Sequence, residues 1–492
     1  MHTLTVYWAD SVYSIPAEHG QSLLALLTKA EITVYAPCNG RGVCRKCRVA
    51  YRSGGVTKQV LACQTTITED AEIWISHVSG SGLTAFEKIH WPDTGSGIGA
   101  AVDIGTTTVA AALVDCGNGQ VLASGAKLNP QHVCGSDVIS RIAACGKGML
   151  PLLTNLIRKT VDSLVQGLCQ KHGITKPEIL TVSGNTTMLH LFCGVDPMPI
   201  GIAPFVPPFT EMKVFSGNEL NITANTVFAL PSASGYIGSD VVCGILATQL
   251  KNSGVSLLVD LGTNGEFALY NGKQLFCTSA AVGPALEGAN ISCGIGGIPG
   301  AICSVAHENG IFSWKTIEDQ PPIGICGSGL VDLMALLLDT GIVDEGGRFC
   351  ENSSHPLAEE RLRDGRFMLT DQIWLSQEDV RQFQLAKAAV IAGIITLCDY
   401  AGVCVENVEN IFLTGGLGYY IPYKSALRTG LIPKCFSGKL TSVGNSSLAG
   451  AIACLLPIIR EEAIEIAQAI EICNLQNTAK FSDMFLDSLC FE

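Results

Sequence analysis

Four cysteines near the N-terminus have a spacing suited to binding a metal cluster. Cys38, Cys44, Cys47 and Cys63 follow the pattern C-x5-C-x2-C-x15-C. The loop that carries the first three also contains two glycines, an asparagine and two arginines. Small, conformationally free residues let a loop wrap tightly and turn N–H groups toward sulfur, and arginine offsets the negative charge of thiolates and sulfides. The pattern predicts that these four cysteines ligate a 2Fe–2S cluster.

Two further segments have residues suited to holding phosphate and a divalent cation. Residues 103–108 read Asp-Ile-Gly-Thr-Thr-Thr, and residues 260–265 read Asp-Leu-Gly-Thr-Asn-Gly. A turn of Gly and Thr presents N–H and hydroxyl groups to phosphate oxygens, and an Asp beside it holds Mg²⁺, usually through water. We therefore expect Asp103 and Asp260 to organise Mg²⁺. The expected phosphate contacts are Gly105, Thr106, Thr107, Thr108, Gly262, Thr263, Asn264 and Gly265.

Both segments belong to an internal duplication. Each opens a strand–turn–strand hairpin, with turns at 117–119 and 271–272. Each half then has a predicted helix that contains a Cys, a Gly four residues after that Cys, and a strand that runs into a polar or glycine-rich turn. In the second half that turn is Gly415-Gly416, which would let adenosine lie close to the backbone. Two such halves facing across a cleft resemble the actin-like ATPases, so the predicted fold is α/β with two ribonuclease-H-like halves. A structural duplication without a ligand is the alternative.

The elements around the cysteines resemble a ferredoxin β-grasp. Strands are predicted at 4–8 and 12–16, a helix at 22–29, and a closing strand at 71–76. Plant-type ferredoxins have C-x4-C-x2-C and a longer final gap, so this would be a variant α+β 2Fe–2S module. A zinc site is the alternative, although zinc usually takes two C-x2-C pairs and only one is present.

Composition limits the other possibilities. The chain has 492 residues, 47% hydrophobic and 15% charged, which is enough for two or three packed domains. The net charge of −13 argues against nucleic acid as a partner. The uncharged run 449–459 is too short to span a bilayer, and no signal peptide is apparent. Twenty-one cysteines in a large apolar chain suit a reducing compartment, so we expect a cytoplasmic protein without a membrane partner.

The expected domains are a ferredoxin-like domain at 1–78, a linker at 79–97, and a C-terminal tail at 476–492. Between them lie the first ATPase half at 98–250 and the second at 251–475. Glycine and serine predominate at both ends of the linker, which marks a flexible boundary.

A ferredoxin-like segment followed by a duplicated ATP-binding domain resembles the reductive activators of corrinoid-dependent methyltransferase systems. The similarity rests on the cysteine pattern with Leu-Ala-Cys-Gln at 61–64, and on the segments 103–108, 129–131, 135–141, 183–188, 260–266, 283–288 and 413–416. Better-known members carry a separate middle domain, and only the linker stands in that place here. The chain is therefore predicted to be a short variant without the middle domain.

The resemblance implies a function, cofactors and partners. An activator of this kind hydrolyses ATP and passes one electron from its 2Fe–2S cluster to a protein-bound corrinoid, converting inactive Co(II) to Co(I) in anaerobic methyl transfer or O-demethylation. It implies Mg²⁺, a low-potential upstream electron donor and a homodimer. Asp137 and Glu266 are the two candidates for positioning the attacking water, because both lie beside the shared motifs.

Three other functions remain open on the sequence. An activator of 2-hydroxyacyl-CoA dehydratases is also an electron-transferring ATPase, but it has no fused ferredoxin. A small-molecule kinase with a redox-sensing ferredoxin would need a carboxylate base in the cleft, and nothing in the chain excludes it. A chaperone-like ATP switch is disfavoured because it has no use for an electron.

Overall fold

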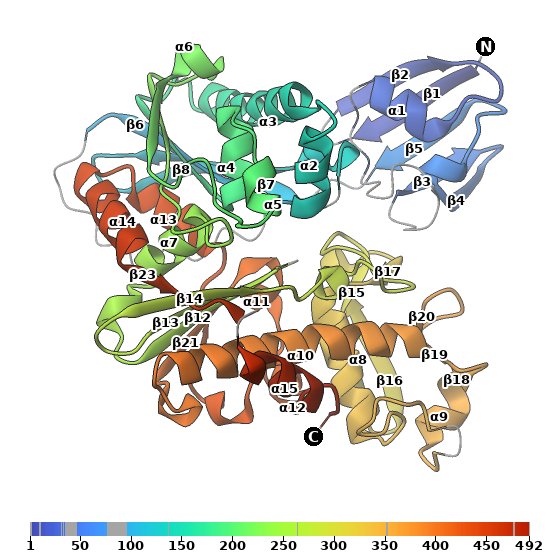
Figure 1. The fold of residues 1–492 in the computed structure, drawn as a ribbon. Coiled ribbons are helices and arrows are strands. Elements are labelled where there is room, and N and C mark those ends of the chain that lie inside the picture. Colours follow the sequence, from blue (N-terminus) through green and yellow to red (C-terminus); the bar gives the residue numbers. More distant parts are fainter. Residues whose placement is uncertain are drawn as a thin grey trace.

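A five-stranded sheet with one helix forms the N-terminal module (Figure 1). The computed structural model describes residues 2–8, 11–30, 32, 34, 47–75, 96–135, 137–262, 264–350, 353–475 and 478–491. The strand order is β2-β1-β5-β3-β4, with β1 and β5 parallel. The elements are β1 (His2–Trp8), β2 (Ser11–Ala17), α1 (Leu23–Lys29), β3 (Arg48–Ser53), β4 (Val56–Leu61), the 3₁₀ turn η1 (Ala62–Gln64) and β5 (Ala71–Ile75).

This module agrees with the expected strands and helix. The buried leucines of α1 pack with alternate strand residues in one hydrophobic core. The β3–β4 hairpin is an addition that the sequence did not predict. Most of the predicted cluster loop and of the linker 79–97 lies outside the described residues.

The first ATPase half is built on a six-stranded sheet of order β10-β11-β9-β6-β7-β8. Its strands are β6 (Ile98–Ile104), β7 (Thr108–Asp115), β8 (Gln120–Leu128), β9 (Ile179–Gly184), β10 (Lys213–Ser216) and β11 (Thr226–Ala229). Its helices are η2 (Pro130–Val133), α2 (Val138–Cys145), α3 (Leu150–Lys171), α4 (Thr186–Cys193), α5 (Met198–Gly201), α6 (Gly217–Leu220) and α7 (Ser239–Ala247), with the 3₁₀ turn η3 (Leu250–Asn252) following.

The second half has a sheet of order β22-β21-β12-β13-β14-β23. Its strands are β12 (Ser256–Leu261), β13 (Gly265–Tyr270), β14 (Leu275–Ala280), β21 (Asn410–Thr414), β22 (Leu440–Ser442) and β23 (Ile470–Ile472). Its helices include η4 (Pro284–Glu287), α8 (Gly327–Asp339), α10 (Gln377–Tyr400), η6 (Val405–Asn407), α11 (Gly415–Tyr420), α12 (Tyr423–Arg428), η7 (Lys434–Phe436), α13 (Ser446–Ala453), α14 (Pro457–Ala469) and α15 (Ala479–Asp487).

Smaller elements complete the second half beside α8 (Figure 1). One three-stranded sheet contains β15 (Ala301–Glu308), β16 (Ile311–Thr316) and β17 (Gly324–Ile325), with η5 (Ile317–Asp319) in between. Another contains β18 (Leu362–Arg363), β19 (Arg366–Met368) and β20 (Trp374–Ser376), preceded by α9 (Pro356–Arg361). The segment predicted as a C-terminal tail packs α15 against α10 and buries Phe491.

The register of the two sheets reproduces the duplication. In one half Asp103 pairs with Ser183 across β6 and β9, and in the other Asp260 pairs with Thr414 across β12 and β21. Both pairs are parallel, and each Asp strand is antiparallel to the strand that follows it. The helix ends also match, because the N–H five residues after Cys169 and after Cys398 bonds back to that cysteine's carbonyl, at 3.0 and 2.9 Å. The predicted repeat is therefore present in the fold.

Three helices form much of the core in and between the two halves. Helices α7 and α13 pack against each other between the two sheets and share one hydrophobic cluster. Helix α10 is long and apolar enough to cross a membrane by length and composition, but 72% of its most apolar window is buried inside the protein. It is therefore a core helix of the second half.

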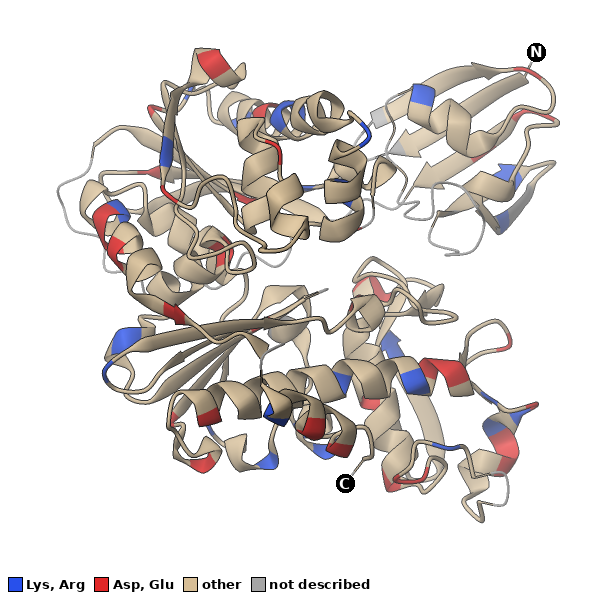
Figure 2. Ribbon diagram, in the orientation of Figure 1, with Lys and Arg blue, Asp and Glu red and all other residues tan. Residues whose placement is uncertain are grey.

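Lys and Arg are scattered among Asp and Glu over both halves (Figure 2).

Candidate functional site

The turn between β6 and β7 is braced from outside the cleft. The carbonyls of residues 105–108 accept, in chain order, from Asn129 Nδ2 at 2.9 Å, an Arg141 N–H at 2.6 Å, the Asn129 N–H at 2.8 Å and the Gly105 N–H at 2.9 Å. No hydrogen bond between described residues uses the N–H of Thr106 or Thr107. The turn thus has its acceptors satisfied and keeps donors for an anion, which is what phosphate binding requires.

Arg141 holds this turn from the protein interior. Its side chain is fully buried and also donates to the Gly135 carbonyl at 3.0 Å and to Gln131 Oε1 at 3.2 Å. On the other side, Asn185 Nδ2 donates to Thr106 Oγ1 at 3.2 Å. A buried guanidinium with its donors fixed by several acceptors makes the turn rigid.

Asp103 lies at the end of β6 and faces the N-terminus of α13. Ser447 Oγ donates to Asp103 Oδ1 at 2.7 Å, and Asn445 Nδ2 donates to Oδ2 at 2.9 Å. Burial raises the pKa of Asp103, and these two hydrogen bonds oppose the rise by favouring the ionised form. Because α13 belongs to the second half, Asp103 ties the two halves together.

Four more carboxylates form a group with Asp103 in which the charge of one raises the pKa of another. Burial, with Asp103 adding to it, raises the pKa of Asp240 to about 7. Burial and the charges of Asp240, Asp103 and Glu287 raise the pKa of Asp260 to about 8. The pKa of Glu266 is raised well above its ordinary value by the same two causes. Partly buried acids in this number favour a bound cation.

The positive side chains described in the structure lie apart from four of these acids. Among the described residues, no Lys or Arg forms an ion pair with Asp103, Asp240, Asp260 or Glu266. Nor do any three His, Cys, Asp or Glu side chains in the described ranges come close enough to ligate one ion together. Mg²⁺ keeps several of its waters and takes only one or two carboxylates, so the arrangement fits water-mediated Mg²⁺ binding.

The second turn closes on the Gly415-Gly416 segment. Gly415 has φ 84°, and a Cβ there would lie 2.4 Å from Asp260 Oδ1. A side chain at this position would therefore be strained and would also displace the carboxylate. Gly416 has no heavy atom within 4 Å of its missing Cβ, which leaves this position open. Within the turn itself the Gly262 N–H bonds the Asn264 carbonyl at 3.1 Å, and Thr263 lies outside the described residues.

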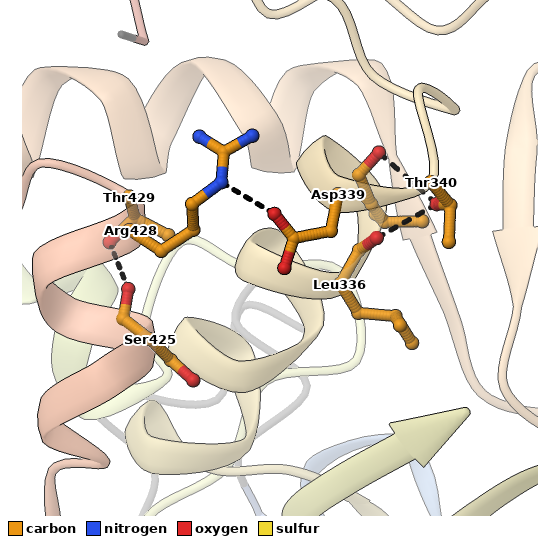
Figure 3. Close-up of polar contacts among 7 residues, drawn as sticks. Leu336, Asp339, Thr340, Ser425, Arg428 and Thr429 are labelled. Carbon is orange, nitrogen blue, oxygen red and sulfur yellow. Dashed lines mark hydrogen bonds and ion pairs between the residues drawn. The ribbon is translucent and has the colours of Figure 1, made fainter. Parts of the chain in front are cut away.

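Helix α8 contacts α11, which begins at Gly415, and α8 is also joined to α12, as the Arg428–Asp339 contact in Figure 3 shows. Arg428 Nε donates to Asp339 Oδ1 at 2.5 Å, and Ser425 Oγ donates to Asp332 Oδ1 at 2.7 Å. These bonds join α12 to α8, and a Cβ on Gly327 at the start of α8 would lie 2.8 Å from Leu417 in α11. The predicted adenosine side of the cleft is therefore supported by α8.

The two candidates for water positioning differ in their surroundings. Asp137 is the N-cap of α2, and its Oδ1 accepts from the Ser140 N–H at 2.8 Å in a capping box. Glu266 pairs with Asp260 across β12 and β13, and its pKa responds to Asp240, Asp260 and Glu287. Since capping already occupies Asp137, Glu266 is the stronger of the two candidates.

Two of the four predicted cluster ligands are described, and the β3–β4 hairpin brings them together. Cys47 precedes β3 and is fully buried, and Cys63 follows β4 and is half-buried. The Cys63 N–H points to Cys47 Sγ at 3.4 Å, and the Ala62 N–H bonds the Cys47 carbonyl at 2.8 Å. An N–H aimed at a ligand sulfur is a feature of iron–sulfur sites. Cys38 and Cys44 lie outside the described residues.

Sequence reasoning missed three residues of the cleft. Asp240 lies in the first turn of α7, and Asn445 and Ser447 lie at the start of α13. A signal was present, because each half continues with a helix that follows a Gly and begins with small polar residues. Extending the duplication to these helices would have found them.

Comparisons with known proteins agree with this geometry. Residues 98–253 match the family described as the RACo middle region, and residues 254–492 match the C-terminal domain of RACo, the ASKHA domain. The chain is 30% identical over 525 residues to the corrinoid activation enzyme RamQ of Eubacterium limosum, covering 87% of this chain and 88% of that protein. It is 28% identical over 358 residues to a [Co(II) methylated amine-specific corrinoid protein] reductase of Methanosarcina barkeri, covering 65% and 63%.

A solved structure extends the similarity to the whole chain. The reductive activator for corrinoid, iron–sulfur protein superposes with a TM-score of 0.73 at 27% identity, covering 100% of this chain and 98% of that one. The prediction that the middle domain is missing is wrong, because residues 98–253 match the middle region. This region is the first half of the duplication, so assigning it to the ATPase left nothing to count as a middle domain.

Proposed function

This chain belongs to the family of corrinoid-activating reductases, and from that premise we propose that it uses ATP to reduce a protein-bound Co(II) corrinoid to Co(I). The observation that carries the proposal is that one chain combines two features. One is a hairpin that brings the Cys63 N–H to Cys47 Sγ, and the other is a group of acidic side chains contributed by both duplicated halves. The first supplies a site for an electron carrier, and the second supplies a site for Mg²⁺ and ATP.

In the N-terminal module, Cys47 and Cys63 would hold a 2Fe–2S cluster together with Cys38 and Cys44. A plant-type cluster supplies a one-electron carrier near roughly −400 mV. Burial of Cys47 and the N–H aimed at its sulfur would tune the reduction potential of this cluster. The electron donor would be a low-potential protein, as the family resemblance implies.

In the cleft, the two halves would bind ATP from opposite sides. The donors of Thr106 and Thr107 would face phosphate oxygens, with Asp103 and Asp260 holding waters of the Mg²⁺ shell. Glu266 would then orient the water that attacks the terminal phosphate, because its carboxylate lies in the same acidic group. Closure of the cleft would follow from both halves contacting one nucleotide.

ATP has a defined physical task in this reaction. A Co(II) centre whose potential lies below that of the electron carrier is reduced only in small yield, and each ~59 mV costs a factor of ten for one electron. A protein that binds its corrinoid partner differently in its ATP and ADP states can shift this balance. The partner would therefore be a corrinoid protein. The activator itself would be cytoplasmic and would act as a homodimer.

One anaerobic experiment tests the proposal. The purified protein is mixed with a Co(II) corrinoid protein, a reductant and MgATP, and the visible spectrum is followed for Co(I). We expect Co(I) only with ATP, and neither with the Cys63→Ser variant nor with Asp260→Asn. Iron, sulfide and zinc analysis of the same sample distinguishes a 2Fe–2S cluster from a zinc site. Equal Co(I) yields with and without ATP would rule the proposal out.

A further inference from the structure

The segment Asn129-Pro130-Gln131-His132 joins the phosphate-binding turn to the N-terminal module. Asn129 is buried and bonds the turn through both its side chain and its backbone N–H. It also accepts from the Gln131 N–H at 3.0 Å, which fixes the start of η2. The segment belongs to the motifs that the family resemblance singled out, and the proposed chemistry gives it no role.

His132 makes contact with both parts of the protein. Its Nδ1 lies 2.8 Å from the Asn129 carbonyl, which leaves Nε2 for a second hydrogen bond, to the backbone of Val34. Because this second bond also favours the protonated ring, its partner is the Val34 carbonyl. Val34 is buried in the core of the N-terminal module and lies four residues before Cys38. Figure 1 shows this module beside α2, the helix that follows η2.

A neutral imidazole cannot satisfy both carbonyls at once. It carries one N–H, so it donates either to Asn129 or to Val34, whereas the charged ring donates to both. Burial lowers the pKa of His132, and the charge of Arg141 adds to this effect. Asn129 therefore bonds both His132 and the turn, and Arg141 bonds the Thr106 carbonyl of the turn while its charge acts on His132.

We propose that His132 is the positioning residue that couples nucleotide binding to the contact between the N-terminal module and the first half. The negative charge of a bound phosphate favours the charged ring, so His132 takes up a proton from solvent and donates to both carbonyls, whereas without nucleotide the neutral ring donates to the Asn129 carbonyl alone. The bond to Val34 is thereby made in one nucleotide state and released in the other. This inference rests on the proposed ATP site, and it supplies the two-state element that differential partner binding requires.

Hydrogen exchange tests the coupling without measuring activity. The full-length holoprotein is compared with and without a non-hydrolysable ATP analogue and Mg²⁺, and exchange is followed in peptides containing Ile32 and Val34. We expect a nucleotide-dependent change of about fivefold in wild type, the change in local opening that one net hydrogen bond supplies. Nucleotide affinity is measured on every sample, so that a loss of binding is recognised.

Two conservative variants separate the two bonds. An Asn amide reaches where Nδ1 lies and a Gln amide reaches where Nε2 lies, so His132→Asn keeps the Asn129 contact and His132→Gln keeps the Val34 contact. We expect the nucleotide-dependent difference to disappear in both variants, with exchange at Val34 fast in His132→Asn and slow in His132→Gln. His190→Gln is the matched control, since His190 is equally buried and bonds the Thr186 carbonyl within its own helix.

The outcomes separate this inference from the proposed function. If the exchange difference is absent in wild type, or persists unchanged in both His132 variants, the coupling is refuted even where Co(I) still forms. If Co(I) never forms but the exchange difference depends on His132, the coupling stands and the corrinoid function falls. Loss of the difference in His190→Gln as well would assign the effect to general destabilisation and overturn the role of His132.

Discussion

The two ATPase halves share a strand order but hold their acidic residues in different ways. In the first half, Asp103 receives hydrogen bonds from Ser447 and Asn445. In the second half, burial and neighbouring carboxylates raise the pKa of Asp260 to about 8, and no hydrogen bond from the described residues is among the causes that act on it. Hydrogen bonds therefore offset part of the cost of ionising Asp103, whereas Asp260 relies on a bound cation for that compensation. Duplication preserved the backbone, and the side chains around each Asp gave the halves different tasks.

The largest difference is expected between Asp103→Asn and Asp260→Asn. Both variants should lose ATP hydrolysis by about 10²–10³-fold, because a charge that organises the metal is removed. Their stabilities should change in opposite directions. An amide at 103 cannot accept from both Asn445 and Ser447 as the carboxylate does, whereas an amide at 260 removes a charge that burial disfavours once the pH exceeds about 8.

Nucleotide-free melting temperatures, measured at about pH 9 where Asp260 is ionised, test this contrast. We expect Asp103→Asn to melt below wild type and Asp260→Asn to melt above it. Equal shifts in the two variants would mean that the halves hold their carboxylates alike, contrary to the comparison above.

Removing the brace of the first turn should have the next largest effect. Arg141→Met leaves the Thr106 and Gly135 carbonyls without their buried donor, which should cost about 3 kcal/mol and weaken ATP binding by at least about tenfold. Arg460→Met is the matched control, because Arg460 is also buried and bonds the Cys454 and Leu455 carbonyls away from either turn. It should lose stability in denaturant titrations but keep its affinity for ATP. Equal affinities in both variants would remove the assigned role of Arg141.

A smaller effect is expected at the glycine that closes the second turn. Gly415→Ala meets both a positive φ and the Asp260 carboxylate, so it should cost about 2 kcal/mol or more and reduce ATP affinity. Gly402→Ala has a similar φ of 68° with nothing within 4 Å of its Cβ. This control should cost only about 1 kcal/mol and bind ATP normally. Isothermal titration with an ATP analogue decides between steric displacement of Asp260 and backbone strain alone.

The sequence predicted those parts of the fold that local chemistry marks. The Asp-x-Gly-Thr turns and the Cys-to-Gly helix ends revealed the duplication, because both are short and recur at equivalent places. The β3–β4 hairpin was missed, since its charged and polar residues lack a clear alternation. Asp240 and Asn445 were missed for another reason. They reach the acidic group through the packing of α7 on α13, so they could be predicted only by extending the duplication to the polar residues that begin these two helices.

The smallest expected effect is on how the melting temperature depends on pH, through the raised pKa values of one Asp from each half. The pKa of Asp240 is about 7 and that of Asp260 about 8 in the folded protein, against about 3.9 for an unfolded Asp. Between pH 4 and 8 the folded state therefore binds more protons, and the stability these groups contribute is lost as pH rises. The melting temperature of the nucleotide-free protein should fall by a few degrees more than that of Asp240→Asn from about pH 5.5 to 8.5. Bound Mg²⁺ and ATP analogue should remove this difference, since a cation compensates the ionised groups. A melting temperature that falls equally in wild type and variant would mean that Asp240 is already compensated within the protein, and the cleft would then have no need of Mg²⁺ at that position.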